Sequence, residues 1–174
     1  LNGNLDFVSG LESSFIHDLL TQDGDLLPKR QDELNLLKAP YLNSEYLGIN
    51  MTSQPDGSPL KIKEIRKTIN LGLDRELMFD ALRNGVGKPA KSGFVPSGLP
   101  SYNPKKVKGY SFNPDSARIL ISKAGFGSDN PLPEIELFTN KDYLDLTTFI
   151  ARQWQEIGVK TKIEVLESSI LRDG

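Results

Sequence analysis

The last third of the chain has the pattern that restricts the fold most: a strand, a helix and a second strand within residues 134–166. Residues 135–138 and residues 161–165 each indicate a strand. The helix between them repeats apolar residues three and four apart and ends at Gly158; these residues are Leu146, Phe149, Ile150, Trp154 and Ile157. Strands joined by a helix of this length run parallel, with a right-handed crossover. A βαβ unit and an α/β fold class are therefore expected.

Residues 58–125 predict a helical part with identifiable helix starts. Ser58 and Pro59 suit the start of the first helix, Asp74 the cap of the second, and Asn113 the cap of the third. Their apolar stripes are Ile62, Ile65, Ile69 and Leu73, then Leu77, Met78, Ala81 and Leu82, then Ala117, Leu120, Ile121 and Ala124. Between the second and third helices, residues 85–111 predict a long irregular loop, which is usually functional or wraps a neighbour.

The first 51 residues predict short strands and one helix. Residues 5–8 indicate a strand, and residues 15–20 place four apolar side chains on one side of a helix. Residues 32–38 and 45–51 are expected to be extended. In the second of these, Leu47, Ile49 and Met51 alternate with Tyr46, Gly48 and Asn50. This alternation predicts a strand with one face in the core.

Composition narrows the possible classes of function. The 174 residues are 37% hydrophobic and 25% charged, which is typical of a globular chain. The net charge is −2 with acids and bases interleaved, so nucleic acid is not expected as a partner. The chain has no cysteine, which excludes disulfides, thiolate nucleophiles and cysteine-ligated metals. Apolar runs are short, so no membrane span is expected.

The sequence offers no convincing catalytic constellation. His17 is the only histidine and is interpreted as a surface or half-buried residue. Glu134 and Glu136 share one strand face; a paired-carboxylate site is conceivable there, although solvent-facing glutamates are the commoner cause. Residues 85–88 lack the spacing of a phosphate loop. The lysines within residues 105–108 are interpreted as a solvated loop. No enzyme activity, cofactor or metal is expected.

Several segments, in order along the chain, resemble the family 5 solute-binding proteins, the peptide and nickel group of ABC-transporter receptors. Residues 3–7 (GNLDF) are similar to the "G-x-(I/L)-D" strand of the family, and residues 46–50 (YLGIN) to its "Y-L-x-x-N" strand. Further resemblances are IRKTIN…LGLDR at 65–75, GVGKPA at 85–90, FNPDSAR at 112–118, AGF at 124–126 and WQEIGVK at 154–160. Each motif is weak alone, but together they cover nearly the whole chain.

The resemblance implies one lobe of a type II periplasmic-binding-protein-like fold, with a mixed sheet flanked by helices. Residues 1–174 would form part of the C-terminal lobe of a two-lobed receptor. Within it, residues 1–51 would be the hinge-proximal strands and helix, residues 58–125 the helical part, and residues 134–166 the βαβ unit. The chain would stop before the family's "G-W-x-x-D" segment, which carries the aspartate that pairs with a peptide's amino group.

Two walls of a ligand pocket are predicted. In open α/β sheets, ligands lie beyond the carboxyl ends of the strands. This rule selects the turn after residue 138, where helix N–H groups and a lysine could receive an anion; the turn residues are Thr139, Asn140, Lys141 and Tyr143. Tyr46 and Asn50 are the candidates for the other wall. Core packing is the alternative role for Tyr46, and a simple helix cap for Asn140. Dipeptide-binding relatives have an arginine near this turn, and Lys141 is only a monodentate substitute.

The resulting hypothesis is a non-catalytic, monomeric receptor of an ABC importer that captures oligopeptides by hinge closure and presents them to the permease. A periplasmic or other extracytoplasmic location follows from the resemblance, with a lipid anchor possible in the full-length protein. The alternatives are a receptor for a metal chelate or an oligosaccharide, the sensor lobe of a regulatory protein, and a small hydrolase that uses Glu134 and Glu136.

Overall fold

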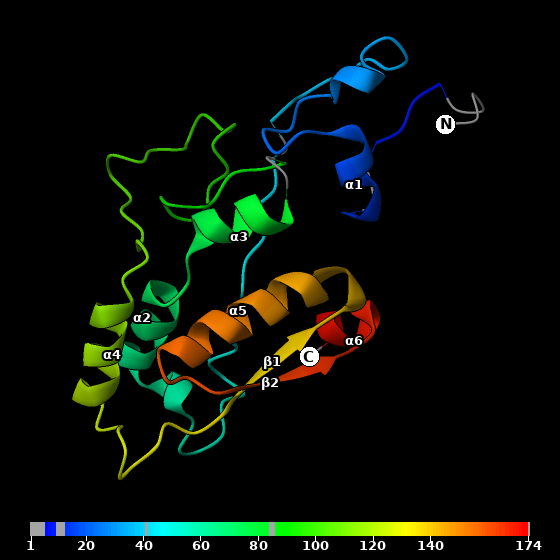
Figure 1. The fold of residues 1–174 in the computed structure, drawn as a ribbon. Coiled ribbons are helices and arrows are strands. Elements are labelled where there is room, and N and C mark those ends of the chain that lie inside the picture. Colours follow the sequence, from blue (N-terminus) through cyan, green and yellow to red (C-terminus); the bar gives the residue numbers. More distant parts are fainter. Residues whose placement is uncertain (1–5, 10–12, 41, 84–85, 174) are drawn as a thin grey trace.

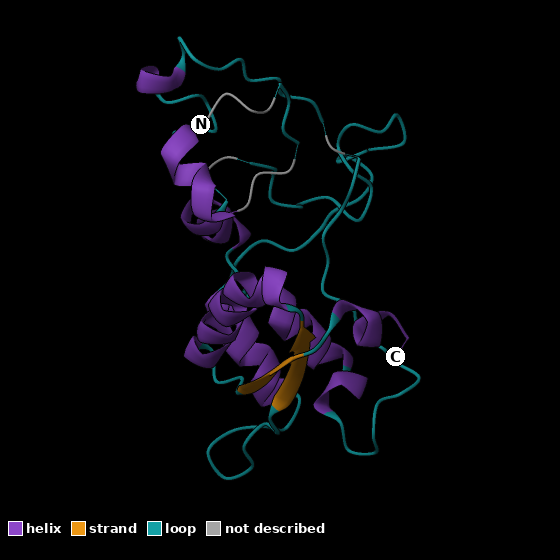
Figure 2. Ribbon diagram, turned by 90° about the vertical axis from the view of Figure 1, so that its right-hand side faces the viewer, coloured by secondary structure: helices purple, strands orange, loops and turns teal. Residues whose placement is uncertain are grey.

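The structure is a computed structural model that describes residues 6–9, 13–40, 42–83 and 86–173 (Figure 1). Figure 2 shows two differently built parts. One contains both strands and most of the helices, and the other is mainly loop. No helix in the described ranges has the length and apolarity needed to cross a bilayer.

The predicted βαβ unit is present. Strand β1 (Ile135–Thr139) is followed by the short 3-10 helix η3 (Lys141–Tyr143), helix α5 (Leu144–Glu156) and strand β2 (Thr161–Val165). The two strands pair in parallel, with Ile135 opposite Thr161 and Thr139 opposite Val165. Every second β1 residue is buried, which matches a strand with one covered face.

Glycines end two helices as the sequence predicts. Gly158 has φ +90°, and the N–H groups of Gly158 and Val159 donate to the carbonyls of Gln155 and Trp154 at 3.0 and 2.9 Å. This pair of hydrogen bonds is the Schellman motif. The motif needs a residue in the left-handed backbone conformation, which glycine adopts without strain. Gly125 (φ +88°) ends helix α4 (Pro114–Lys123) in the same way.

The core lies where α5, β1, α4 and helix α2 (Lys63–Leu71) meet, and α2 packs against α4 (Figure 1). Trp154 is 2% exposed and its indole N–H donates to the Ile69 carbonyl at 3.0 Å. Burying a large ring while satisfying its single donor is favourable. Gly72 is in close contact with the core, because a Cβ there would lie 2.3 Å from the Ile157 Cδ1 atom.

Two of the three predicted helix caps form and the third is displaced. Asp74 caps helix α3 (Arg75–Leu82), accepting from the N–H groups of Glu76 and Leu77, and Asn113 caps α4, accepting from Ser116 N–H. Ser58 instead caps the 3-10 helix η2 (Pro59–Lys61), and α2 begins after Ile62 without a side-chain cap. A separate 3-10 turn therefore precedes the first predicted helix.

The N-terminal part corrects several predictions. Helix α1 (Ser13–Leu19) is present, and a 3-10 helix, η1 (Pro28–Arg30), follows it. The predicted strand at 5–8 lies partly outside the described residues, and residues 6–8 are not in a strand. Residues 32–38 and 45–51 form no strands either, and Leu47 and Met51, expected in the core, are 45% and 44% exposed. A strand needs a hydrogen-bonded neighbour, and no described strand lies beside residues 45–51.

Residues 86–112 form the long irregular loop that was predicted. The N–H of Gly109 donates to the Lys91 carbonyl at 3.1 Å, which closes the loop on itself. The Ser44 hydroxyl donates to the Phe94 carbonyl at 2.7 Å, and the rings of Tyr46 and Phe94 meet edge to face with centroids 4.8 Å apart. We call residues 42–51 the strap, because this segment holds the loop.

Helix α6 (Ser168–Asp173) follows β2 and was not predicted. The backbone at Leu166 stays tied to the sheet, since its N–H donates to the Thr139 carbonyl at 2.7 Å. This bond brings the start of α6 beside the carboxyl end of β1.

Candidate functional site

The turn after β1 is built by Asn140. Its side-chain oxygen accepts from the Tyr143 N–H at 3.2 Å and so caps η3, while its side-chain nitrogen donates to the Ser168 hydroxyl at 3.0 Å. Asn140 therefore caps a helix, which is the alternative to ligand binding that its position in the sequence suggested. It also connects the turn to α6.

Thr139 lies beneath this turn and not on its surface. Thr139 is only 5% exposed and Thr147 on α5 is 6% exposed. Their hydroxyl oxygens lie 3.0 Å apart. The Thr147 hydroxyl also donates to the Tyr143 carbonyl at 2.9 Å. The two threonines thus join strand, turn and helix.

Lys141 projects from the turn as an exposed residue. Among the described residues no carboxylate pairs with its ammonium group, whereas the nearby Arg83 is paired with Asp145 at 3.1 Å. The turn therefore presents an exposed ammonium group, next to the carboxylate of Asp142 in the chain, at the carboxyl end of a parallel strand pair. An ammonium group of this kind suits a carboxylate or phosphate on a ligand.

Tyr143 faces the strap. Its hydroxyl donates to the Glu45 carboxylate at 3.2 Å. Partial burial raises the pKa of Tyr143 above its ordinary value, and the charge and hydrogen bond of Glu45 raise it further. A carboxylate next to a phenol disfavours the phenolate, so this contact holds the hydroxyl as a donor.

The other two predicted ligand residues, Tyr46 and Asn50, lie on the strap but do not meet the turn through any described contact. Tyr46 is 72% exposed with its ring against Phe94, so it does not have the alternative role of a core residue. The Asn50 side-chain oxygen accepts from the N–H and the hydroxyl of Thr52, at 3.1 and 2.7 Å. It stabilises a local turn.

Sequence reasoning missed two residues of this region. Glu45 gave no signal, because its partner is 98 positions away in the chain. Thr147 could have been found, since it lies four residues after Tyr143 on the face of α5 that the apolar periodicity marks as buried.

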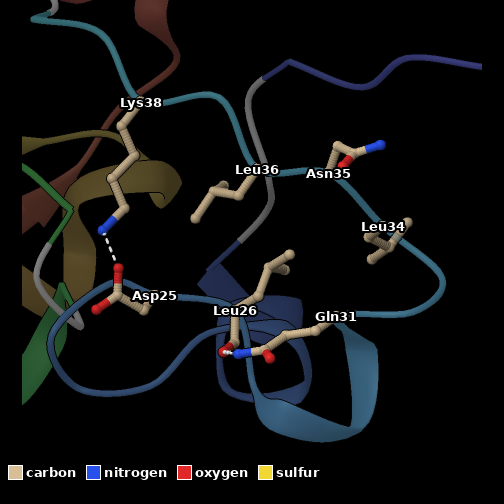
Figure 3. Close-up of a pocket in the computed structure, with 7 residues that line it drawn as sticks. All are labelled: Asp25, Leu26, Gln31, Leu34, Asn35, Leu36 and Lys38. Atoms are coloured by element: carbon tan, nitrogen blue, oxygen red, sulfur yellow. Dashed lines mark hydrogen bonds and ion pairs between the residues drawn. The ribbon is translucent and has the colours of Figure 1, made fainter.

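A hollow of about 650 Å³ lies elsewhere, in the N-terminal part (Figure 3). Asp25 and Lys38 form an ion pair across its edge at 2.6 Å, and the Gln31 amide donates to the Leu26 carbonyl at 3.5 Å. Its charged groups are already paired with each other, and it includes no residue of the turn after β1. It is a weaker candidate than the turn.

The residues that the sequence offered as candidates for catalysis lie on the surface. His17, Glu134 and Glu136 are exposed. Lys162 lies 2.7 Å from Glu164 and 3.4 Å from Glu136, and these contacts, Glu164 first, raise the pKa of Lys162. The described residues contain no group of three or more histidine, aspartate or glutamate side chains placed to hold a metal ion.

A family model described as bacterial extracellular solute-binding proteins, family 5 Middle, matches residues 1–173. The chain is 26% identical to the dipeptide-binding protein of Escherichia coli over 148 residues, which is 82% of this chain and 26% of that protein. It is also 26% identical to heme-binding protein A of Haemophilus influenzae over 76% of this chain and 24% of that protein. The chain thus spans about a quarter of the length of these curated relatives.

Solved structures show the same fold. The oligopeptide-binding protein of Thermus thermophilus, solved with a pentapeptide, matches with a TM-score of 0.56 and 26% identity, over 64% of this chain and 21% of that one. The similarity therefore covers a minor part of that protein and most of this chain.

Proposed function

The chain belongs to the bacterial extracellular solute-binding proteins, family 5, and on that premise we propose that the complete protein captures oligopeptides for an ABC importer. The observation that carries the proposal is the turn after β1, which presents the ammonium group of Lys141, paired with no carboxylate in the described part of the chain, at the carboxyl edge of the parallel pair. That edge is where α/β sheets bind ligands. The peptide class is supported by the dipeptide-binding relative and by the relative solved with a pentapeptide.

In this proposal the chain supplies one wall of a cleft between two lobes. Lys141 receives the ligand carboxylate, and Tyr46 of the strap offers an exposed ring to the ligand. Ligand that bridges both lobes stabilises the closed form, and the closed form is presented to the permease. The protein acts as a monomer outside the cytoplasm, periplasmic or lipid-anchored, and performs no catalysis.

A metal chelate is the second candidate ligand. Its support is the heme-binding relative, which is as similar to this chain as the dipeptide-binding one. An oligosaccharide receptor and the sensor lobe of a regulator remain further alternatives, because one fold serves several ligands.

The test is calorimetric titration of the complete protein with an equimolar pool of tripeptides and, separately, with hemin. The peptide proposal expects heat of binding from the pool and none from hemin. Lys141→Gln should weaken peptide binding about ten- to a hundredfold, because a charge-assisted contact contributes roughly 1.5–3 kcal/mol. Lys160→Gln is the matched control, because Lys160 is an exposed lysine immediately before β2, and this variant should bind as the unsubstituted protein does. Binding of hemin alone would select the chelate receptor instead.

A further inference from the structure

Two buried hydroxyls lie under the turn that carries Lys141. Thr139 and Thr147 are 5% and 6% exposed, and their hydroxyl oxygens are 3.0 Å apart. A buried hydroxyl needs a hydrogen-bond partner, because a buried polar group that has lost its contacts with water and gains no partner destabilises the fold. Neither side chain is available to a ligand, so these residues can contribute to binding only by stabilising the backbone of the turn above them.

The arrangement of protons gives the two residues unequal roles. Each hydroxyl has a single proton. The Thr147 hydroxyl lies 2.9 Å from the Tyr143 carbonyl, which can only accept, so the proton of Thr147 belongs in that bond. Thr139 is then free to donate to the Thr147 oxygen. The result is a chain of donors that runs from Thr139 to Thr147 to the Tyr143 carbonyl.

Both ends of the segment that contains Lys141 are held in place, and this chain fixes the end at Tyr143. Tyr143 is held through its carbonyl by Thr147 and through its N–H by the Asn140 side chain at 3.2 Å. On the other side of Lys141, the Thr139 carbonyl accepts from the Leu166 N–H at 2.7 Å. A lysine side chain is long and loses rotamer entropy on binding, so a fixed backbone beneath it determines where its ammonium group can reach.

We propose that Thr147, with Thr139, is a positioning residue that sets the preference of the site for a ligand carboxylate. The inference rests on the proposed function, since it assigns Lys141 to that carboxylate. Thr147 itself touches no ligand. It acts by holding the backbone of residues 139–143.

The neighbouring threonine provides a matched control. The Thr148 hydroxyl donates to the Leu144 carbonyl at 2.7 Å, in the same four-residue geometry on the same helix, but Thr148 is only half-buried and makes no described contact with the turn. Thr148→Val therefore removes the same kind of bond as Thr147→Val without touching the chain of donors.

The experiment measures the affinity of the complete protein for an equimolar tripeptide pool and for the same pool amidated at the C-terminus. The unsubstituted protein should prefer the free carboxylates. Thr147→Val should reduce this preference about tenfold, a loss that corresponds to about 1.4 kcal/mol. Thr147→Ser, which keeps the hydroxyl, should restore it. Thr139→Val should have a smaller effect, because Thr147 still holds the Tyr143 carbonyl. Thr148→Val should leave the preference unchanged.

The outcomes separate the inference from the proposed function. If the unsubstituted protein binds neither pool, the oligopeptide function is overturned and the inference with it. Equal binding of both pools removes the carboxylate role of Lys141 and also overturns the inference. If the preference exists and survives in Thr147→Val, or is lost equally in Thr148→Val, the inference alone is wrong. Should Thr147→Val fail to fold, an unchanged preference in Thr139→Val overturns it.

Discussion

The contact between Tyr143 and Glu45 joins the turn after β1 to the strap through a single hydrogen bond of 3.2 Å. Both residues are exposed, so the contact contributes little at neutral pH, about 0.5–1 kcal/mol. Its dependence on pH is more informative than its size, because the phenol can donate only while it is protonated.

Stability at alkaline pH should report this contact. Burial and Glu45 raise the pKa of Tyr143 in the folded chain above its ordinary value of 10.0. The stabilisation is therefore fully present below the unfolded pKa and is lost as the pH rises through the folded one. The free energy of unfolding should fall more steeply above pH 10 in the unsubstituted chain than in Tyr143→Phe, as measured by urea denaturation. Tyr110→Phe, at an exposed loop tyrosine, is the control. Equal slopes in the unsubstituted chain and Tyr143→Phe would contradict the prediction.

The residues of the candidate site were predictable only where local rules decide their position. Asn140 follows a strand and precedes a helix, and it caps as such a residue should. Glu45 could not be found, since nothing local connects the strap to a turn 98 positions later. Thr139 was predicted at the right turn, but its burial depends on the packing of α5 against β1.

Helices and the βαβ unit were predicted well because their signals are local. Asp74, Asn113, Gly125 and Gly158 are caps or terminators that act within a few residues, and all four do so. The prediction of a strand at 45–51 was wrong. Alternating apolar residues indicate that one face of a strand is covered, but they do not provide a neighbouring strand to pair with. Strand pairing depends on segments that are far apart in the sequence, and among the described strands only β1 and β2 pair.

The junction between α2 and α5 should tolerate no added methyl group at Gly72. A Cβ there would lie 2.3 Å from Ile157 Cδ1 and 3.2 Å from the Thr68 carbonyl oxygen, and Ile157 is only 4% exposed. Gly72→Ala should therefore destabilise the chain by about 1–3 kcal/mol, the usual cost of overpacking. Thermal or urea unfolding measures this.

A control and a rescue accompany this prediction. Gly127→Ala meets no atom within 4 Å and should change stability by less than about 0.5 kcal/mol. Ile157→Val removes the Cδ1 atom, so adding it to Gly72→Ala should recover part of the loss. A Gly72→Ala chain as stable as the unsubstituted one would show that the α2–α5 junction has room to adjust.

Across the whole molecule, the well-packed part contains β1, β2, α2, α4 and α5. The strap and the long loop, drawn mainly as loop in Figure 2, expose many of their apolar side chains. Exposed apolar residues gathered on the strap and the loop are Leu42, Tyr46, Leu47, Phe94 and Val95. In the proposed function the chain supplies one wall of a closed cleft. On its own it therefore makes only some of the ligand contacts of the complete protein.

The 174-residue chain on its own should accordingly bind the tripeptide pool at least about tenfold more weakly than the complete protein, because the contacts of the second wall are missing. Calorimetry on both proteins under the same buffer conditions measures the ratio. Equal affinities would falsify the two-lobe account and would place the whole site within this chain.

The two-stranded sheet has a consequence for the behaviour of the chain in solution. A sheet of two strands has two outer edges, each with a row of backbone groups able to pair with another chain, which is the usual starting point of aggregation. The uncovered face beside those edges carries Lys162 between Glu136 and Glu164, with Phe138 56% exposed among them. Any chain that added a strand there would have to accommodate this fixed pattern of charges. The row of charges therefore disfavours the addition of a strand whose own charges do not complement it.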